Sequence, residues 1–264
     1  SNGQVLPRCE IPQTIFNSLD WVNSRWGANA IIESGNGTRD RLRHAIQHMS
    51  FDRYPSSTVY SHTGWCKHDD HGMIYLHGGG AIGAQGSVPG IEVQLPSALR
   101  EYILPEPPTG EALKAAILSS MKFLEVAPDA VAIPLWLSTF RAALDVTRFT
   151  VFLYGETGTR KSGLAALLLQ HFASQMHRNN LPANWSSTAN SLEMLLSSAK
   201  DTALVIDDFN PTGSANDAHR LHAKAERVLR GQANGQARGR LASQNDMWVQ
   251  RSGTPPRGLC IVTG

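Results

Sequence analysis

The chain has 264 residues, of which 41% are hydrophobic and 17% are charged, and its formal net charge at pH 7 is +2. A chain of this length and composition can bury one large core or two smaller ones, which excludes the disordered and fibrous classes. The longest apolar stretches, at 131–140 and 164–172, are shorter than the ~20 residues that a membrane-spanning helix needs, so we expect no membrane segment. The charge is uneven, because residues 151–264 carry 12 Lys and Arg against 8 Asp and Glu.

Two features indicate the cellular compartment. The three cysteines, Cys9, Cys66 and Cys260, are odd in number and far apart, which is typical of a reducing environment rather than of a disulfide framework. The first residues lack the basic start and apolar block of a secretory signal. We therefore expect a cytoplasmic protein.

Residues 1–104 are predicted to form a small α+β accessory domain. Helical periodicity is expected at 15–27 and 39–49, and strand-like alternation at 57–62, 73–77 and 91–95. Three prolines at 105–108 can continue neither a helix nor a strand, so we place the domain boundary there.

The pattern changes after this boundary. Two helices, at 110–127 and 128–144, make 105–148 a helical linker region. From residue 149 onward, short apolar strands alternate with helices, which predicts a parallel sheet covered on both faces. The strands are expected at 149–154, 202–207 and 258–264, and the helices at 161–176, 191–200 and 216–230.

The stretch GETGTRKS at 155–162 lies between a predicted strand and a predicted helix, as a phosphate-binding loop does. In such a loop the backbone N–H groups and the helix N-terminus attract phosphate, the Lys reaches the outer phosphates and the Ser hydroxyl binds magnesium. Gly155, Gly158, Lys161 and Ser162 suit these roles. The expected nucleotide-binding residues are Gly155, Glu156, Thr157, Gly158, Thr159, Arg160, Lys161, Ser162 and Gly163.

Arg160 departs from the usual spacing, in which a glycine precedes the Lys. A Cβ at this position can crowd the approach of the backbone to phosphate. The Arg160 side chain either turns to solvent or adds a positive charge near the phosphates, and the sequence leaves both open. The alternative for the whole loop is a plain strand-to-helix connection with incidental glycines.

Paired acids follow the apolar strand in ALVIDDF at 203–209. We expect Asp207 to hold Mg²⁺ together with Ser162, and Asp208 to position or deprotonate the attacking water. Thr263 ends the last predicted strand and is a candidate sensor of the terminal phosphate. Alternatively, the acids only close a strand and the Thr is structural. The catalytic candidates are thus Lys161, Asp207, Asp208 and Thr263, with ATP and Mg²⁺ as the ligands.

Between residues 219 and 257 the chain carries eight Lys and Arg against two acids. The Gly- and Gln-rich part of this segment is too polar for a core and resembles a mobile basic loop that reaches a phosphate backbone. The alternative is a solvated helix face followed by a surface loop. The expected contacts to DNA, single-stranded by preference, are Arg220, Lys224, Arg227, Arg230, Arg238 and Arg240.

Two further motifs are predicted to be structural. HGGGAIG at 77–83 matches a dinucleotide-binding spacing, but Gly and Pro follow where a helix would have to start, so we interpret it as a glycine-rich turn. His62, Cys66, His68, His71 and His77 are close in sequence but lack the pair spacing of a zinc site, and we expect no metal there.

Six runs, taken in chain order, resemble one family. They are GWCKHDDHGMIYLHGGGAIG, LPEPPTGEAL, GETGTRKSGLAALLLQHF, LPANWSSTANSLEMLLSSAKDTALVIDDFNPTGS, RLHAKAERVLR and PPRGLCIVTG. Together they resemble the bacterial, phage and plasmid family catalogued as domain of unknown function 927, P-loop ATPases found in primase-helicase-like proteins of mobile elements. The resemblance extends from about Phe16 to Gly264.

The resemblance implies an α/β fold in which a small α+β domain precedes a RecA/AAA-like P-loop core at 149–264. It implies nucleotide and magnesium roles for Lys161, Ser162 and Asp207, and a link to the replication or transfer of mobile elements. Such a core continues with a further strand, a helix and an arginine that reaches a neighbouring subunit, so we expect it to be incomplete at its C-terminus and to form a ring when full length.

These observations lead to one main hypothesis, a helicase-like ATP hydrolase that acts on DNA. The alternative is a nucleotide-dependent DNA-binding or scaffold protein with weak or no hydrolysis. A small-molecule kinase would share the loop, but it needs a lid and an acceptor pocket for which the sequence has no motif.

Overall fold

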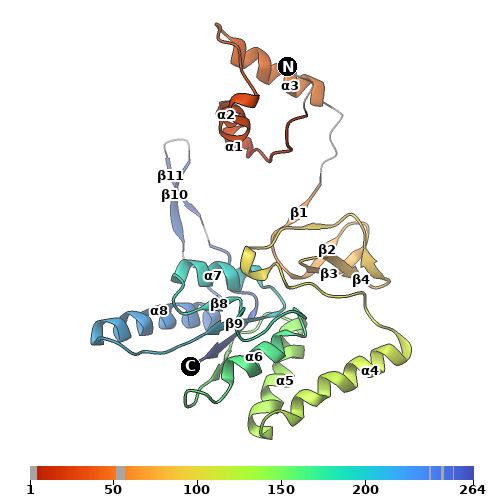
Figure 1. Cartoon of the computed structure of the whole chain (residues 1–264), viewed down its shortest axis with the longest axis vertical. Helices are drawn as coiled ribbons and strands as arrows, with labels where there is room; N and C mark the ends of the chain where they lie inside the picture. The colour runs from red at the N-terminus through yellow and green to blue at the C-terminus, as the bar shows by residue number, and fades with distance from the viewer. Residues whose placement is uncertain (1–4, 52–56, 238, 245–246, 252) are drawn as a thin grey trace. The chain divides into compact units, whose positions relative to one another are not determined.

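The computed structural model describes residues 5–51, 57–237, 239–244, 247–251 and 253–264 (Figure 1). The chain divides into two compact units, residues 1–57 and 58–264. This division differs from the predicted boundary at 104, because residues 58–104 pack with the C-terminal core. No helix of the described residues combines the length and the hydropathy that crossing a membrane requires.

The first unit is helical in its described part. It contains α1 (Gln13–Phe16), α2 (Asp20–Trp26), the 3-10 helix η1 (Gly27–Asn29) and α3 (Thr38–Ser50). Leu19, with φ of 57°, interrupts the single helix predicted at 15–27. Its buried side chain and those of Trp21 and Val22 form a separate small core.

The second unit begins with β-structure. It contains β1 (Val59–Tyr60), β2 (Gly64–His68), β3 (Gly72–His77), β4 (Gly80–Gly83), β5 (Gly86–Val88), β6 (Glu92–Val93) and the 3-10 helix η2 (Ser97–Leu99). β2 to β5 form an antiparallel sheet in sequential order, and β1 pairs in parallel with β6. The strand predicted at 57–62 corresponds to β1, which is only two residues long. The run GWCKH, which was not predicted as a strand, forms β2.

Buried tyrosines join this β-structure to the core. The Tyr75 hydroxyl donates to the Asp201 carbonyl at 2.7 Å, and the Tyr102 hydroxyl donates to the Ala203 carbonyl at 2.9 Å. Leu95, Leu99 and Tyr102 belong to the main hydrophobic core. These contacts explain why 58–104 is part of the larger unit instead of an independent accessory domain.

The rest of the second unit alternates helices and strands. Its elements are α4 (Gly110–Met121), η3 (Lys122–Glu125), α5 (Asp129–Leu144), β7 (Thr150–Leu153), α6 (Lys161–Leu169), β8 (Ala183–Asn184), α7 (Ala189–Ser198), β9 (Ala203–Asp207), α8 (Ala215–Asn234), β10 (Arg240–Gln244), β11 (Met247–Arg251) and β12 (Leu259–Thr263).

A parallel sheet in the order β7-β12-β9-β8 confirms the predicted mixed α/β class. β9 and β12 are its central strands, and their apolar residues, from Ala203 to Ile206 and from Leu259 to Val262, are fully buried. Such continuous burial requires cover on both faces. Because all four strands are parallel, their carboxyl ends meet at one edge of the sheet.

Two predicted segments differ from the structure. The helix expected at 161–176 ends at Leu169, and residues 170–180 form turns. The segment expected to be a basic loop after α8 contains an antiparallel hairpin, in which Arg240 pairs with Arg251 and Gln244 with Met247.

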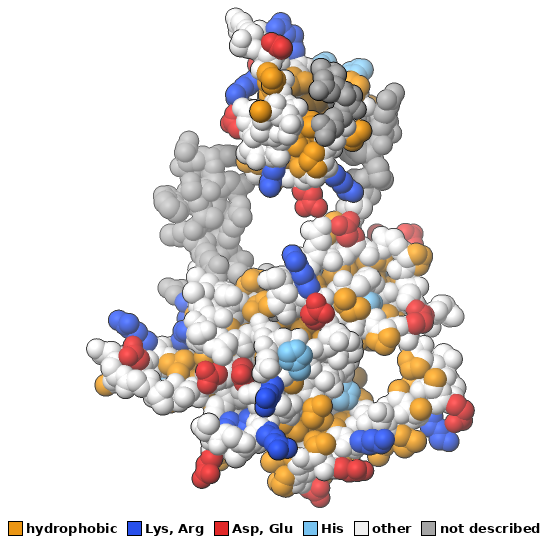
Figure 2. All heavy atoms as spheres, in the orientation of Figure 1, with side chains coloured by type: hydrophobic (Ala, Val, Ile, Leu, Met, Phe, Trp, Pro, Cys, Tyr) orange, Lys and Arg blue, Asp and Glu red, His pale blue; other side chains and the backbone are white. Residues whose placement is uncertain are grey.

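The helices α4 and α5 present apolar side chains to solvent (Figure 2). The exposed large ones are Leu113, Ile117, Leu118, Met121, Val131, Ile133, Leu137, Phe140 and Leu144. No residue of α4 is buried, whereas α5 buries Leu135 and Ala142 in the core. The segment predicted as a linker therefore contributes one packed helix and one peripheral helix.

Candidate phosphate-binding site

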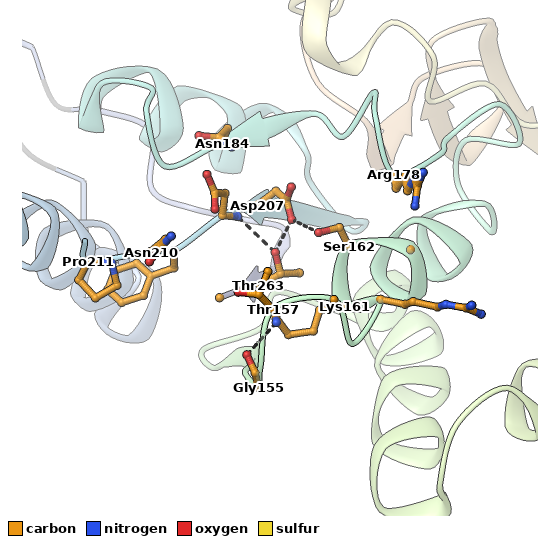
Figure 3. A pocket seen from close by; sticks show the side chains of 16 residues that line it. Gly155, Thr157, Lys161, Ser162, Arg178, Asn184, Asp207, Asn210, Pro211 and Thr263 are labelled. Atoms are coloured by element: carbon orange, nitrogen blue, oxygen red, sulfur yellow. Dashed lines mark hydrogen bonds between the residues drawn. The ribbon is translucent and has the colours of Figure 1, made fainter. Parts of the chain in front are cut away.

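A pocket of about 650 Å³ opens where the carboxyl ends of β7, β12 and β9 meet the N-terminus of α6 (Figure 3). Its lining contains the phosphate-loop candidate, both predicted acids and the end of the last strand. The lining residues are Gly155, Thr157, Gly158, Arg160, Lys161, Ser162, Gly163, Arg178, Asn184, Asp207, Asp208, Phe209, Asn210, Pro211, Thr263 and Gly264. Of the predicted site residues, only Glu156 and Thr159 are not in this lining.

Lys161 lies against the inside of its own loop. Its ammonium donates to the carbonyl oxygens of Gly155 at 2.8 Å and Glu156 at 2.9 Å. The Thr159 hydroxyl also donates to the Glu156 carbonyl, at 2.8 Å, which closes the loop. The ammonium therefore lies close to the backbone of the loop. From this position a lysine can reach an anion that binds to the loop.

Arg160 is the N-cap residue of α6 and adopts a left-handed conformation, with φ of 63° and ψ of 26°. This conformation costs a residue with a Cβ ~1–2 kcal/mol, which glycine avoids. The conformation explains why glycine is usual before the Lys of such loops. The Arg160 side chain is exposed and lines the pocket.

Ser162, Asp207 and Thr263 meet at the centre of the site, as the labelled side chains in Figure 3 show. Asp207 Oδ1 accepts a hydrogen bond from Ser162 Oγ at 2.7 Å and another from the Thr263 hydroxyl. The three residues come from α6, β9 and β12, which are distant in sequence. β12 lies between β7 and β9 in the sheet, and this order places Thr263 beside both the loop and the acid.

This set of donors suits a hard divalent cation. One carboxylate and one hydroxyl at the mouth of a solvent-open pocket leave room for the waters that Mg²⁺ retains. Thr263 is almost fully buried, at 1% exposure, and its hydroxyl also accepts a hydrogen bond from the Asp208 backbone N–H at 3.3 Å. The Thr263 hydroxyl therefore bonds to the carboxylate of Asp207 and to the backbone N–H of Asp208.

Asp208 directly follows β9 at the edge of the sheet. Its φ of 63° is left-handed, and the next residue, Phe209, donates its N–H to the Thr263 carbonyl at 2.7 Å. Within the described part of the chain, the Asp208 carboxylate has no hydrogen-bond or ion-pair partner. An exposed carboxylate that lines the pocket is available to a water or to a ligand.

Six lining residues were not predicted from the sequence, and three of them, Arg178, Asn184 and Asn210, have polar side chains. Asn184 ends β8 and is in register with Asp207. β8 is only two residues long, so no alternation marks it in the sequence. Arg178 lies in a turn and Asn210 lies in an irregular segment after β9, and neither belongs to a motif that the sequence shows.

The predicted DNA-contacting residues divide into two groups. Lys224 donates to the carbonyl oxygens of Trp185 at 2.7 Å and Ser187 at 2.8 Å. Arg227 forms a bidentate ion pair with Glu193 of α7, at 2.7 and 2.8 Å, and this carboxylate raises the pKa of Arg227 above its ordinary value. The prediction that these two side chains face DNA is therefore corrected, because both fasten α8 to neighbouring segments.

The other predicted contacts are exposed or are not described. Arg220 and Arg230 are exposed on α8, and Arg230 pairs with Glu226 one turn away. Arg238 lies outside the described residues, and Arg240 is the first residue of β10. The basic surface that the structure describes on α8 is therefore smaller than the sequence predicted.

The glycine-rich and histidine-rich motifs lie in and around the antiparallel sheet. The glycines after His77 lead into β4 and not into a helix, so the dinucleotide spacing is a turn between strands. His77 Nδ1 accepts from the N–H groups of Gly79 and Leu104, each at 3.2 Å. Among the described residues, no three His, Cys, Asp or Glu side chains are grouped so that they could share a metal ion.

No family model and no curated protein matches the chain. Among solved structures, it is similar to one described as "SCCmec type IV Cch - active helicase", with 19% sequence identity and a TM-score of 0.43. The match covers 85% of this chain and 39% of the other, so the chain spans about two fifths of that helicase chain's length.

Proposed function

We propose that the pocket at the sheet edge binds Mg²⁺-ATP and hydrolyses it. The observation that supports this most is the convergence of Ser162 and Thr263 on Asp207 beside the Lys161 loop. A strand end alone gives no reason for two hydroxyl groups from distant segments to share one carboxylate oxygen. A magnesium-phosphate site gives such a reason, because the hydroxyl and the carboxylate are both magnesium ligands.

In this proposal each residue has one task. The loop N–H groups and Lys161 bind the β- and γ-phosphates, and Ser162 and Asp207 hold the metal ion. The bound magnesium neutralises charge that develops on the phosphates. Asp208 accepts a hydrogen bond from the attacking water and orients it for in-line attack, and Thr263 holds the Asp207 carboxylate and the Asp208 backbone N–H.

We further propose that the chain belongs to the mobile-element ATPases catalogued as domain of unknown function 927 and acts as a helicase-like motor on DNA. The ordered motifs support the family, and the exposed Arg220 and Arg230 on α8 support contact with a phosphate backbone. A ring of subunits is part of the same proposal.

A specific observation favours the second candidate, a nucleotide-dependent binder with weak hydrolysis. Asp208 has a short side chain, its backbone is left-handed, and its exposed carboxylate has no partner among the described residues that would fix its rotamer. A base that is not held in position orients water poorly. This candidate predicts Mg²⁺-ATP binding by calorimetry with negligible turnover.

The test compares ATP turnover, with and without single-stranded DNA, for the wild-type chain and for Lys161→Ala and Asp208→Asn. Lys114→Ala, which removes a positive charge from the exposed surface of α4, is the matched control. The motor proposal expects turnover that DNA stimulates and that Lys161→Ala abolishes. Turnover that survives Lys161→Ala would contradict the assignment of the loop, whereas tight binding without turnover would favour the binder.

A further inference from the structure

Arg178 projects from a turn that is held in place by its own hydrogen bonds. Asn180 Oδ1 accepts from the His177 N–H at 2.6 Å, and the Asn180 N–H donates to the His177 carbonyl at 3.0 Å. The His177 ring accepts from the Asn179 N–H at 3.2 Å. The turn is therefore ordered internally, and none of these bonds uses the Arg178 side chain.

The turn is also fastened to the helix that starts at the phosphate loop. Gln170, at the end of α6, donates its side-chain N–H to the Met176 carbonyl at 2.9 Å, and the Met176 side chain is 2% exposed in the main core. On the other side the chain enters β8, where Ala183 is buried. A turn anchored on both sides holds its arginine at a fixed place relative to α6 and the loop.

The Arg178 side chain lines the same pocket as Lys161, Ser162 and Asp207 (Figure 3). In the described part of the chain its guanidinium forms no hydrogen bond and no ion pair, and it is exposed. An arginine presented by a fixed turn, in a pocket and without a protein partner, is free to bind an anion.

The charges of the pocket lead to the same conclusion. Its charged lining residues are Arg160, Lys161, Arg178, Asp207 and Asp208. Lys161 donates to loop carbonyls and Asp207 accepts from two hydroxyl groups, so these two charges already have local partners. A magnesium-bound nucleoside triphosphate remains anionic, and Arg178 adds a positive charge to its pocket from outside the loop.

We infer that Arg178 is a second phosphate-binding cation of the site, acting within the same chain as Lys161 and contacting the phosphate chain of the nucleotide. This inference rests on the proposed function, because it assigns a further residue to the same pocket. The guanidinium donates to phosphate oxygens and forms no contact that depends on the base.

The experiment measures binding of Mg²⁺-ATP and of Mg²⁺-tripolyphosphate, which has no base or ribose, to the whole chain by calorimetry. The variants are Arg178→Ala, Arg178→Lys and the control Lys114→Ala. We expect Arg178→Ala to weaken both ligands by about tenfold, the cost of one charge-assisted hydrogen bond, and Arg178→Lys to restore part of the loss. Equal unfolding temperatures of the variants would exclude a general loss of structure.

Each other outcome overturns the inference. If Arg178→Ala binds both ligands as tightly as wild type, Arg178 does not contact the nucleotide, while the proposed function stands. If only ATP binding falls, the residue contacts the base or the ribose instead of the phosphates. If the wild-type chain binds neither ligand, the proposed function fails together with the inference.

Discussion

The two regions predicted to be functional differ in how their polar residues are used. At the carboxyl edge of the sheet, Ser162, Asp207 and Thr263 come from three elements and meet as predicted. On α8, the predicted DNA contacts Lys224 and Arg227 are bound to the protein itself. A parallel sheet brings its strand ends together by topology, whereas the partner of a charge on a helix depends on which helix packs beside it.

The largest expected effect is at the sheet edge. Asp207→Asn keeps an oxygen that accepts from Ser162 and Thr263 but removes the charge that holds magnesium. If the site is an ATPase, turnover should fall by about 100-fold or more, as when other transition-state charge contacts are removed. Steady-state turnover across a magnesium titration measures this. Unchanged turnover at every magnesium concentration would show that the meeting of the three side chains is only structural.

The ion pair between α7 and α8 should affect stability instead. Arg227→Ala removes a partly buried bidentate pair and leaves the Glu193 carboxylate without this partner, so we expect a loss of about 1–3 kcal/mol in the free energy of unfolding. Chemical denaturation measures it. The double variant Arg227→Ala/Glu193→Ala and the two single variants form a double-mutant cycle. The double variant should lose less unfolding free energy than the sum of the losses of the single variants.

The same comparison gives a prediction for DNA. Arg220→Ala together with Arg230→Ala should weaken single-stranded DNA binding by about tenfold and lower the dependence of affinity on salt, if these exposed arginines contact phosphates. Fluorescence anisotropy at several salt concentrations measures both quantities. If Arg227→Ala, compared at a temperature where it stays folded, weakens binding as much as this pair does, the division between structural and exposed cations on α8 is wrong.

The sequence identified the elements that have strong apolar patterns. β7, β9 and β12 and the helices α5 to α8 were all expected near their observed positions, because burial on both faces of a parallel sheet requires continuous apolar runs. The two-residue β8 and the hairpin β10–β11 were missed, since neither has such a run. The position of 58–104 was also missed, because the hydroxyl groups of Tyr75 and Tyr102 bond to backbone carbonyls, and a carbonyl carries no sequence signal.

The candidate site was predictable to the same extent. Residues within a loop motif or directly after an apolar strand were found, and they include Lys161, Ser162 and Asp207. Arg178 and Asn184 were not, because each enters the pocket from a turn or a short strand whose place is set by tertiary packing. Local spacing thus predicts ten of the sixteen lining residues, which come from one loop and two strand ends.

Arg160 gives the smallest expected effect. Its left-handed backbone costs ~1–2 kcal/mol, but glycine loses ~0.5–1 kcal/mol more conformational entropy on folding, so Arg160→Gly should stabilise the chain by about 0.5–1 kcal/mol. Arg160→Ala is the matched variant, because it removes the guanidinium and keeps the strained Cβ. Chemical denaturation should therefore show that Arg160→Gly is more stable than Arg160→Ala, and the opposite order would contradict the left-handed conformation of residue 160.

Calorimetry on the same two variants distinguishes the effect of the Arg160 side chain from that of its backbone. If both variants bind Mg²⁺-ATP as tightly as wild type, the Arg160 side chain turns to solvent. If both bind more weakly, it adds a charge near the phosphates.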